Sequence, residues 1–313
     1  MQDNRKTEAL AQKPDDDNAV GLARLTRGLK RLSEAANAAV RGDATWTSVL
    51  DLALEARTST QKQKYAVSCL MDGKPKFQEQ TLNWIAGLRM CDASEELEIF
   101  VHYTNPQPSA LLSKLEALGV NLVEVKPFGE GPAVYCNKLQ QLPTFEGADF
   151  DEVILSDTDI AFISSPARFA GSGCVRAKVV DMPNPPERVL VELLGRAGFD
   201  VTSLTARPDF AGGDSTHAFN CNGGFYILPG GILTELGRRW VDWSRFCLQQ
   251  GDLLGKRLHH SDQLGFMLAM IEGGFKFDAL PLAANFPTHF GADNYRGIRG
   301  AEIGVLHYHD KVD

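Results

Sequence analysis

Apolar and polar segments alternate from residue 65 onward in a pattern that predicts a sheet flanked by helices. Four short apolar runs bounded by Gly, Pro or Asn predict strands, at 65–71, 97–103, 121–126 and 152–156. The stretches between these runs have helical periodicity, at 77–90, 109–118 and 134–142. This order of strand, helix and strand is typical of an α/β protein with a Rossmann-like, mostly parallel sheet.

The pattern becomes less regular after residue 161. Prolines at 183–186 predict a turn, and residues 207–219 form a polar, Gly-containing stretch that predicts a loop. Helices are predicted at 187–196, 232–249 and 261–272, and strands at 225–228 and 302–308. Long loops of this kind often line substrate sites.

The N-terminal segment differs from the rest of the chain. Residues 1–18 are polar and acidic, which predicts a disordered tail. Leucines at 22, 25, 29 and 32 have helical spacing with basic residues between them, and a second short helix is predicted at 46–57. We therefore predict a tail (1–18), a helical extension (19–60) and a main domain (61–313). The helix that carries these leucines has three candidate binding partners: its own protein, a second copy in a homodimer, or an anionic membrane surface.

Composition narrows the class of protein. Among 313 residues, 43% are hydrophobic, which is enough for a sizeable core, and the net charge of −8 disfavours a nucleic-acid backbone as a partner. The sequence has no apolar run of about 18 residues and no apolar leader, so we expect a cytoplasmic protein. Six scattered cysteines without a Cys-x-x-Cys pair predict buried free thiols rather than a zinc site or disulfides.

Asp157 and Asp159 directly follow the apolar strand predicted at 152–156. Ligands of open α/β sheets bind beyond the carboxyl ends of strands, and paired carboxylates suit Mg²⁺ or Mn²⁺ bridged to substrate phosphates. The same Asp-x-Asp spacing occurs at 15/17 and 149/151, but the first pair lies in an acidic run and the second precedes the strand. A purely structural role, as turn-forming residues that cap the strand, is the alternative.

Five segments together carry a family resemblance. They are Tyr-Cys-Asn-Lys-Leu at 135–139, Val-Ile-Leu-Ser-Asp-Thr-Asp at 153–159, Asn-Gly-Gly-Phe-Tyr-Ile-Leu at 222–228, Ser-Asp-Gln at 261–263 and Val-Leu-His-Tyr at 305–308. In this order they resemble nucleotide-diphosphosugar glycosyltransferases of the GT-A fold, and within them the glycogenin and bacterial galactosyltransferase group. The resemblance covers about residues 65–309. It implies metal-dependent transfer of a hexose from a UDP-sugar to a hydroxyl acceptor on a glycan, lipid or protein, with retention preferred.

The resemblance also implies a metal site and a catalytic group. Asp157, Asp159 and His307 would hold Mn²⁺ or Mg²⁺, with His309 as the nearby alternative to His307. The catalytic set that it implies comprises Asp262, Gln263 and Asn222. The Asp262 carboxylate and the Asn222 amide would contact sugar hydroxyls, and Gln263 would lie near the anomeric carbon. Asp262 also opens a predicted helix, where a capping role is the alternative.

The donor-binding set that the resemblance implies lies around these residues: Met71, Asp72, Lys138, Ser156, Asp157, Gly223 and Gly224. Met71 and Asp72 would line the nucleobase pocket, and Lys138 would pair with phosphate or with an acidic side chain. A surface lysine and a plain tight turn at 222–224 are the structural alternatives. His289 lies in a loop that can reach an acceptor or serve the structure, and His259 and His260 are predicted to be surface residues beside a helix.

Some features depart from the family or fit other proteins. The family signature continues beyond the metal histidine with a glycine and a later lysine, whereas Lys311 comes too early for that role. An inverting enzyme would need a base, for which Asp262 and Asp214 are candidates. A haloacid-dehalogenase-type phosphatase also places Asp-x-Asp after a strand, although Ile-Ala-Phe at 160–162 is atypical of that class. An inactive scaffold that binds sugar nucleotides is the third hypothesis.

Overall fold

The computed structural model describes most of the chain beyond residue 62, namely residues 63–91, 97–200, 204, 206–210, 215–290, 292–295 and 302–309. The chain divides into two compact units, Met1–Lys62 and Gln63–Asp313. The predicted tail (1–18) and helical extension (19–60), with the proposed dimer or membrane contact, lie outside the described residues.

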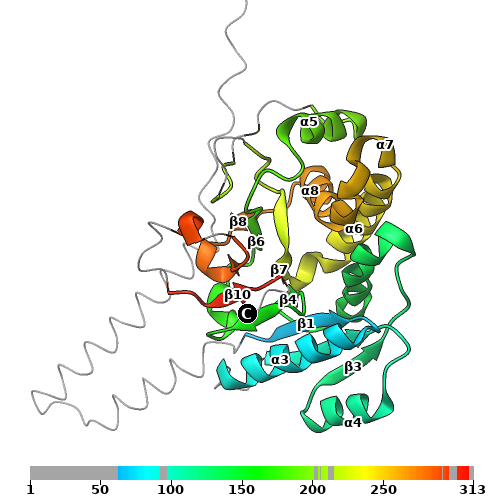
Figure 1. Ribbon diagram of the computed structural model, residues 1–313, viewed down its shortest axis with the longest axis vertical. Coiled ribbons are helices and arrows are strands. Elements are labelled where there is room, and N and C mark those ends of the chain that lie inside the picture. The colour runs from blue at the N-terminus through cyan, green and yellow to red at the C-terminus, as the bar shows by residue number, and fades with distance from the viewer. Residues whose placement is uncertain are drawn as a thin grey trace, which may run out of the picture. The chain divides into compact units, whose positions relative to one another are not determined.

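In the described part of the chain, seven strands form one sheet (Figure 1). These are β1 (Tyr65–Met71), β2 (Leu97–Tyr103), β3 (Asn121–Glu124), β4 (Glu152–Ser156), β6 (Val175–Val179), β7 (Cys221–Pro229) and β8 (Phe277–Ala279). Their order is β3-β2-β1-β4-β7-β6-β8. The first four strands are parallel, β7 runs antiparallel to both of its neighbours, and β6 pairs parallel with β8. The predicted mostly parallel α/β sheet is confirmed.

Helices cover both faces of this sheet because the buried strands are apolar on both sides. One face packs on α3 (Pro75–Cys91) and α4 (Ser109–Ala117), and the other on the 3₁₀ helix η1 (Gly131–Phe145), α6 (Leu233–Leu248) and α8 (Ser261–Gly273). Along β4, Ile154 joins the first layer, whereas Val153 and Leu155 join the second. This period of two is what a strand between two apolar layers requires.

The remaining elements include a second, smaller sheet. A second, three-stranded sheet has the order β5-β10-β9, formed by β5 (Ile160–Phe162), β10 (Val305–His307) and β9 (Phe286–Pro287). It brings the end of the described chain beside the segment that follows β4. Further short elements are α5 (Glu187–Arg196), α7 (Gly251–Leu254), η2 (Pro166–Phe169), η3 (Gly230–Ile232), η4 (Gly255–His260), η5 (Leu282–Ala284) and η6 (Ala292–Tyr295).

Two sequence-based expectations can be compared directly with this architecture. All six cysteines lie in the described residues and are free, as predicted, but Cys91 and Cys174 are only partly buried. The expectation that every thiol is buried was therefore wrong for these two, which lie at the end of α3 and just before β6. Across the residues that the structure describes, we find no helix with the length and apolar character needed to cross a bilayer.

Candidate functional site

A cavity of about 700 Å³ lies beyond the carboxyl ends of β1 and β4. Its walls include ten of the residues that the sequence analysis singled out: Asp72, Lys138, Asp157, Asp159, Asn222, Gly223, Gly224, Asp262, Gln263 and His307. Cavities of this size and position commonly bind nucleotides and other small molecules. Segments that are up to 235 residues apart in the chain, from 72 to 307, therefore meet at one site.

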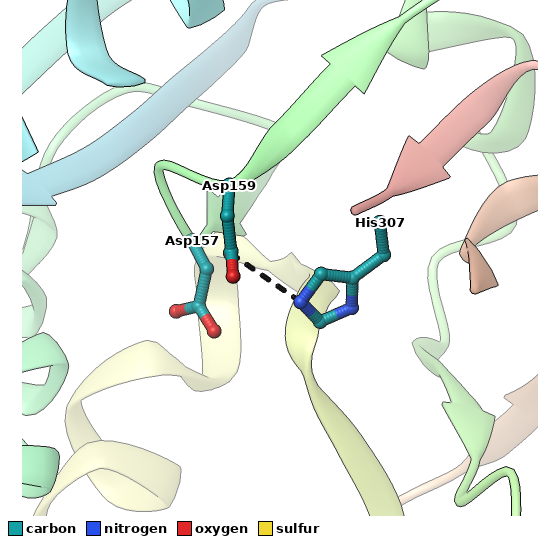
Figure 2. A group of neighbouring side chains, drawn as sticks. All are labelled: Asp157, Asp159 and His307. Atoms are coloured by element: carbon teal, nitrogen blue, oxygen red, sulfur yellow. Dashed lines mark ion pairs between the residues drawn. The ribbon is translucent and has the colours of Figure 1, made fainter. Parts of the chain in front are cut away.

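Asp157, Asp159 and His307 form a group whose ligand atoms all lie within 4.8 Å of one another. Figure 2 shows both carboxylates projecting from the segment after β4, with the imidazole of β10 facing them. The pairing of β10 with β5 sets this arrangement, because His307 lies opposite Ile160 and Tyr308 N–H donates to the Asp159 carbonyl at 3.1 Å. Two carboxylates and one imidazole are a donor set that suits Mn²⁺ or Mg²⁺.

The imidazole of His307 lies close to Asp159 in particular. Its Nε2 atom is 3.3 Å from Asp159 Oδ1. Burial alone would raise the pKa of the Asp159 carboxyl, but the hydrogen bond and charge of His307 outweigh that effect and lower it. Asp159 is therefore held as a carboxylate, the form that binds metal. The His309 ring stacks on His307 at 3.6 Å between centroids, and His309 does not belong to the three-residue group.

Gly224 on β7 leaves room for the His307 ring. A Cβ at position 224 would lie 2.4 Å from His307 Cε1, which is a severe overlap. A Cβ at Gly223 would lie 3.0 Å from Lys138 Nζ and 3.2 Å from Gln263 Cγ. The two glycines thus allow close approach of side chains to the strand. Because residues 222–224 lie within β7, the tight turn named as the structural alternative is wrong.

Lys138 on η1 is the centre of a buried ion cluster. Its Nζ lies 2.8 Å from Asp157 Oδ1 and 3.2 Å from Asp262 Oδ2, and it donates to the Gly223 carbonyl at 2.8 Å. Burial would lower the pKa of the ammonium, but the two carboxylates outweigh it and raise the pKa above its usual value. Burial also raises the pKa of the Asp262 carboxyl. Lys138 is thus not a surface lysine, and its charge is already matched by site carboxylates.

A second buried network supports the η1 helix that carries Lys138. Gln141 Nε2 donates to the Lys138 carbonyl at 3.1 Å, and Ser68 Oγ donates to Gln141 Oε1 at 2.6 Å. Because the single Ser68 proton is used there, His102 Nδ1, 3.0 Å away, must donate to Ser68 Oγ, leaving His102 Nε2 to accept from Thr144 at 2.7 Å. Burial lowers the pKa of His102 to about 4, in agreement with this neutral imidazole.

Asn222 connects the site to a buried charged pair that the sequence analysis missed. Its Nδ2 donates to Asp181 Oδ2 at 2.8 Å. Asp181 also pairs with Lys178 at 2.6 Å, and Lys178, whose side chain is 2% exposed, faces Asp209 at 3.0 Å. A lysine inside the apolar run 175–180, followed by an aspartate, was the available signal. Asp181 lines the cavity and adds a carboxylate to the wall beside Asn222.

Two predicted donor-binding side chains lie away from the cavity lining. The Met71 side chain is fully buried in the core between β1 and α3. Ser156 is also buried, accepting from Trp84 Nε1 at 3.0 Å and donating to the Asp157 carbonyl at 2.9 Å. Asp72 does line the cavity, where Oδ1 accepts from Thr104 Oγ1 and from Gly73 N–H, both at 2.7 Å.

Several histidines occupy unexpected positions. His259 and His260 directly precede α8 and are partly exposed, as expected of residues beside a helix, but both also line the cavity. His260 Nε2 lies 2.6 Å from Asn184 Nδ2, which ties the loop after β6 to the start of α8. His289 also lines the cavity, with its ring 4.1 Å from that of His309. Asp214, a candidate base, lies outside the described residues.

The fold resembles solved glycosyltransferases. The apo form of mouse xyloside xylosyltransferase 1 has 12% sequence identity and a TM-score of 0.52, covering 80% of this chain and 100% of that chain. A galactosyltransferase, LgtC, in complex with donor and acceptor sugar analogues has 14% identity, a TM-score of 0.49 and coverage of 78% and 86%. The glycosyltransferase GlyE of Streptococcus pneumoniae TIGR4 has 15% identity, a TM-score of 0.47 and coverage of 79% and 54%.

No family model matches the chain, and no curated protein matches it. At such low identity, the likeness to the mouse xylosyltransferase speaks for the fold alone, and the two alignments with TM-scores below 0.5 add nothing to it. The predicted GT-A fold is thereby confirmed: a mixed α/β sheet, flanked by helices, with the polar cavity at its carboxyl edge.

Proposed function

We propose that the protein is a metal-dependent glycosyltransferase that moves a hexose from a nucleotide diphosphate sugar, UDP-linked, to a hydroxyl acceptor. The observation that supports this most is the meeting of a cation-binding trio with sugar-binding polar groups in one cavity on a GT-A fold. Asp157, Asp159 and His307 would hold Mn²⁺ or Mg²⁺. When bound there, the cation offsets the charge that develops on the departing nucleoside diphosphate.

The residues of the chain have separable tasks in this proposal. Lys138 fixes the Asp157 carboxylate through an ion pair at 2.8 Å, which keeps it oriented toward the cavity. Asn222 and Asp262, both buried, offer an amide and a carboxylate that suit sugar hydroxyl groups. Gln263 lies against Gly223 on the same wall, where it would face the anomeric carbon. Asp72 offers a carboxylate to a base N–H at the far end of the cavity.

The ion pairs support retention of the anomeric configuration over inversion. An inverting enzyme needs a carboxylate or similar base that is free to take the acceptor proton. The Asp262 carboxylate is 3% exposed and pairs with Lys138, while Asp181 is matched by Lys178. Neither of these two described carboxylates is a free base, and Asp214, the other candidate, lies outside the described residues. A retaining reaction, in which the departing diphosphate itself can take that proton, makes no such demand on the protein.

The test is a panel of nucleotide sugars incubated with the protein and Mn²⁺, with release of nucleoside diphosphate as the readout. We expect release from a UDP-sugar, its loss on chelation with EDTA, and its loss in Asp159→Ala. Asp149→Ala is the matched control, because it alters the Asp-x-Asp pair that precedes the strand, at a side chain that is 92% exposed and bonded to Lys64. NMR of the product anomer reports retention or inversion.

Three outcomes would count against this proposal, and two of them would favour another hypothesis. Absence of release and of binding across the whole panel would contradict the glycosyltransferase proposal. Donor binding without turnover, unchanged in the presence of candidate acceptors, would favour the inactive scaffold. Hydrolysis of p-nitrophenyl phosphate that depends on Asp157 would favour the phosphatase, because a nucleophilic aspartate is central to that chemistry.

A further inference from the structure

Asn285 is a fully buried polar residue that lies between the metal-binding histidine and the sugar-binding amide. It follows η5 and directly precedes β9, the strand that pairs with β10. Its Oδ1 is 3.0 Å from His307 Nδ1, and its Nδ2 is 3.2 Å from Asn222 Oδ1. Asn285 itself is 0% exposed and does not line the cavity. Its role must therefore act through these two neighbours.

The hydrogen-bond partners of Asn222 determine which way both amides point. Asn222 Oδ1 accepts from Gly224 N–H at 2.9 Å, and Asn222 Nδ2 donates to the Asp181 carboxylate at 2.8 Å. A flipped amide would oppose donor to donor and acceptor to acceptor. Since Asn222 Oδ1 is an acceptor, Asn285 must direct its NH₂ group there. Its carbonyl oxygen then faces His307.

The orientation of Asn285 in turn selects the nitrogen of His307 that carries a proton. An amide oxygen only accepts hydrogen bonds, so His307 Nδ1 must be the donor. With Nδ1 keeping its proton toward Asn285, Nε2, which faces Asp159 at 3.3 Å, is the nitrogen whose proton a cation would replace. Metal-binding histidines characteristically need such a partner on the second nitrogen to fix the tautomer and the ring orientation.

We propose that Asn285 is a positioning residue that presents His307 Nε2 to a divalent cation and ties that imidazole to the sugar-binding Asn222. This inference rests on the proposed function and adds a residue that neither touches the substrate nor binds the metal. One uncharged side chain links strand β10, which carries the metal ligand, to strand β7, which carries the sugar-binding amide. Metal binding and the orientation of Asn222 are then coupled.

The test measures the affinity for Mn²⁺ of the full chain, by EPR of the free aquo ion, with and without UDP. Asn285→Leu removes the acceptor at similar size, and we expect affinity to fall about ten- to a hundredfold. Asn285→Asp keeps an acceptor for His307 Nδ1–H but loses the donor to Asn222 Oδ1, and it should retain most of the Mn²⁺ affinity. Asn220→Leu is the matched control, because Asn220 is equally buried but bonds Asn184 and Thr216 instead.

The outcomes separate this inference from the proposal on which it rests. Both Leu variants are expected to lower the melting temperature, so a loss of Mn²⁺ affinity confined to Asn285→Leu and rescued by Asn285→Asp supports positioning. Equal Mn²⁺ affinity in wild type and Asn285→Leu, or equal loss in the Asn285→Asp and Asn285→Leu proteins, overturns the inference and leaves the proposed function intact. A wild-type protein that binds no Mn²⁺ in either condition overturns both.

Discussion

The two carboxylates of the Asp-x-Asp pair, only two residues apart, lie in different environments. Asp157 belongs to the lysine side of the site, defined as Lys138, Asp157 and Asp262, where one ammonium lies within 3.2 Å of both carboxylates. Asp159 belongs to the histidine side, defined as Asp159, His307 and Asn285, where the only close partner of the carboxylate among the described ion pairs is an imidazole at 3.3 Å.

This difference implies that the two sides of the site contribute differently to the stability of the fold and to its function. On the lysine side, the Lys138 ammonium offsets much of the charge of the two carboxylates. The η1 helix that carries Lys138 is supported by the buried network of Ser68, His102 and Gln141. Removing the Lys138 cation leaves the buried Asp262 carboxylate without compensation, which is costly to folding. The histidine side holds two of the three candidate metal ligands, Asp159 and His307, and has no ammonium or guanidinium among its three members. We therefore expect mutations on the histidine side to alter metal binding and catalysis, and mutations on the lysine side to alter stability as well.

Asp159→Asn should give the largest effect on activity. The substitution keeps the size of the side chain but removes the charge, and we expect hexose transfer to fall about a hundred- to a thousandfold, as for loss of one key electrostatic group. The melting temperature should change little. Steady-state kinetics with Mn²⁺ and a UDP-sugar measure the fall, and Asp149→Asn is the control. More than a tenth of wild-type activity in Asp159→Asn would contradict the assignment.

Lys138→Met should give the largest effect on stability. It leaves the buried Asp262 carboxylate without its cation, beside an Asp157 side chain that is 33% exposed, so the free energy of unfolding should fall by about 3 kcal/mol, the low end of the loss for a buried pair. Urea titration measures this change, and Lys114→Met, at an exposed position of α4, is expected to stay within about 0.5 kcal/mol of wild type. An equally small change for Lys138→Met would show that the lysine side does not support the fold.

A fall in pH should destabilise the buried network around His102 that supports the lysine side. The pKa of His102 in the folded protein is about 4, below its ordinary value of 6.5, because the imidazole is buried. Protonation therefore favours the unfolded chain. The stabilisation from neutral His102 is complete above about pH 6.5 and is lost as the pH falls toward 4, by about 3 kcal/mol in total.

Urea midpoints measured between pH 4 and pH 7 test this expectation. Other histidines also titrate in this range, so the informative quantity is the difference in slope between wild type and His102→Gln. The variant is expected to show the flatter profile. Identical slopes would mean that His102 is not the group responsible.

Alanine substitutions at Gly223 and Gly224 should have the smallest effects of this series, and they compare the two sides of the site most directly. A methyl group at Gly224 would overlap the His307 ring at 2.4 Å, so Gly224→Ala should weaken Mn²⁺ binding about tenfold by displacing that ligand. A methyl group at Gly223 would meet Lys138 Nζ, the end of a long side chain, at 3.0 Å and should cost only about 1 kcal/mol of stability as that side chain shifts. Calorimetric titrations with Mn²⁺ compare the two variants. Tighter Mn²⁺ binding by Gly224→Ala than by Gly223→Ala would contradict this expectation.

The sequence predicted the regular half of the fold well because its strands are long apolar runs. Strands β1, β2 and β4 lie where the pattern placed them, and helices α3, α5, α6 and α8 agree within a few residues. Strands β5, β8 and β9 contain only two or three residues, too few for any periodicity to be recognised. The antiparallel direction of β7 depends on partners far away in the chain, which local patterns do not encode.

The candidate site residues also include some that the sequence could identify and some that it could not. Asp157, Asp159 and Asp262 were identifiable because charged residues stood at fixed positions beside apolar elements and in a familiar order. Asn285 and Asp181 gave no such signal, since a polar residue in a loop is ordinary until the fold places it beside another buried polar atom. Ser156 and Met71 show the converse, because residues next to a predicted site turn toward the core instead.

The most direct test of the central claim is a crystal structure of the protein with Mn²⁺ and UDP, using anomalous scattering to locate the ion. We predict one manganese peak within about 2.0–2.3 Å of Asp159, His307 and Asp157 oxygen or nitrogen atoms, with the diphosphate completing the coordination. A peak at another position, or an ion bound to the nucleotide while His307 Nε2 stays out of coordination range, would contradict the claim that these three residues share one cation.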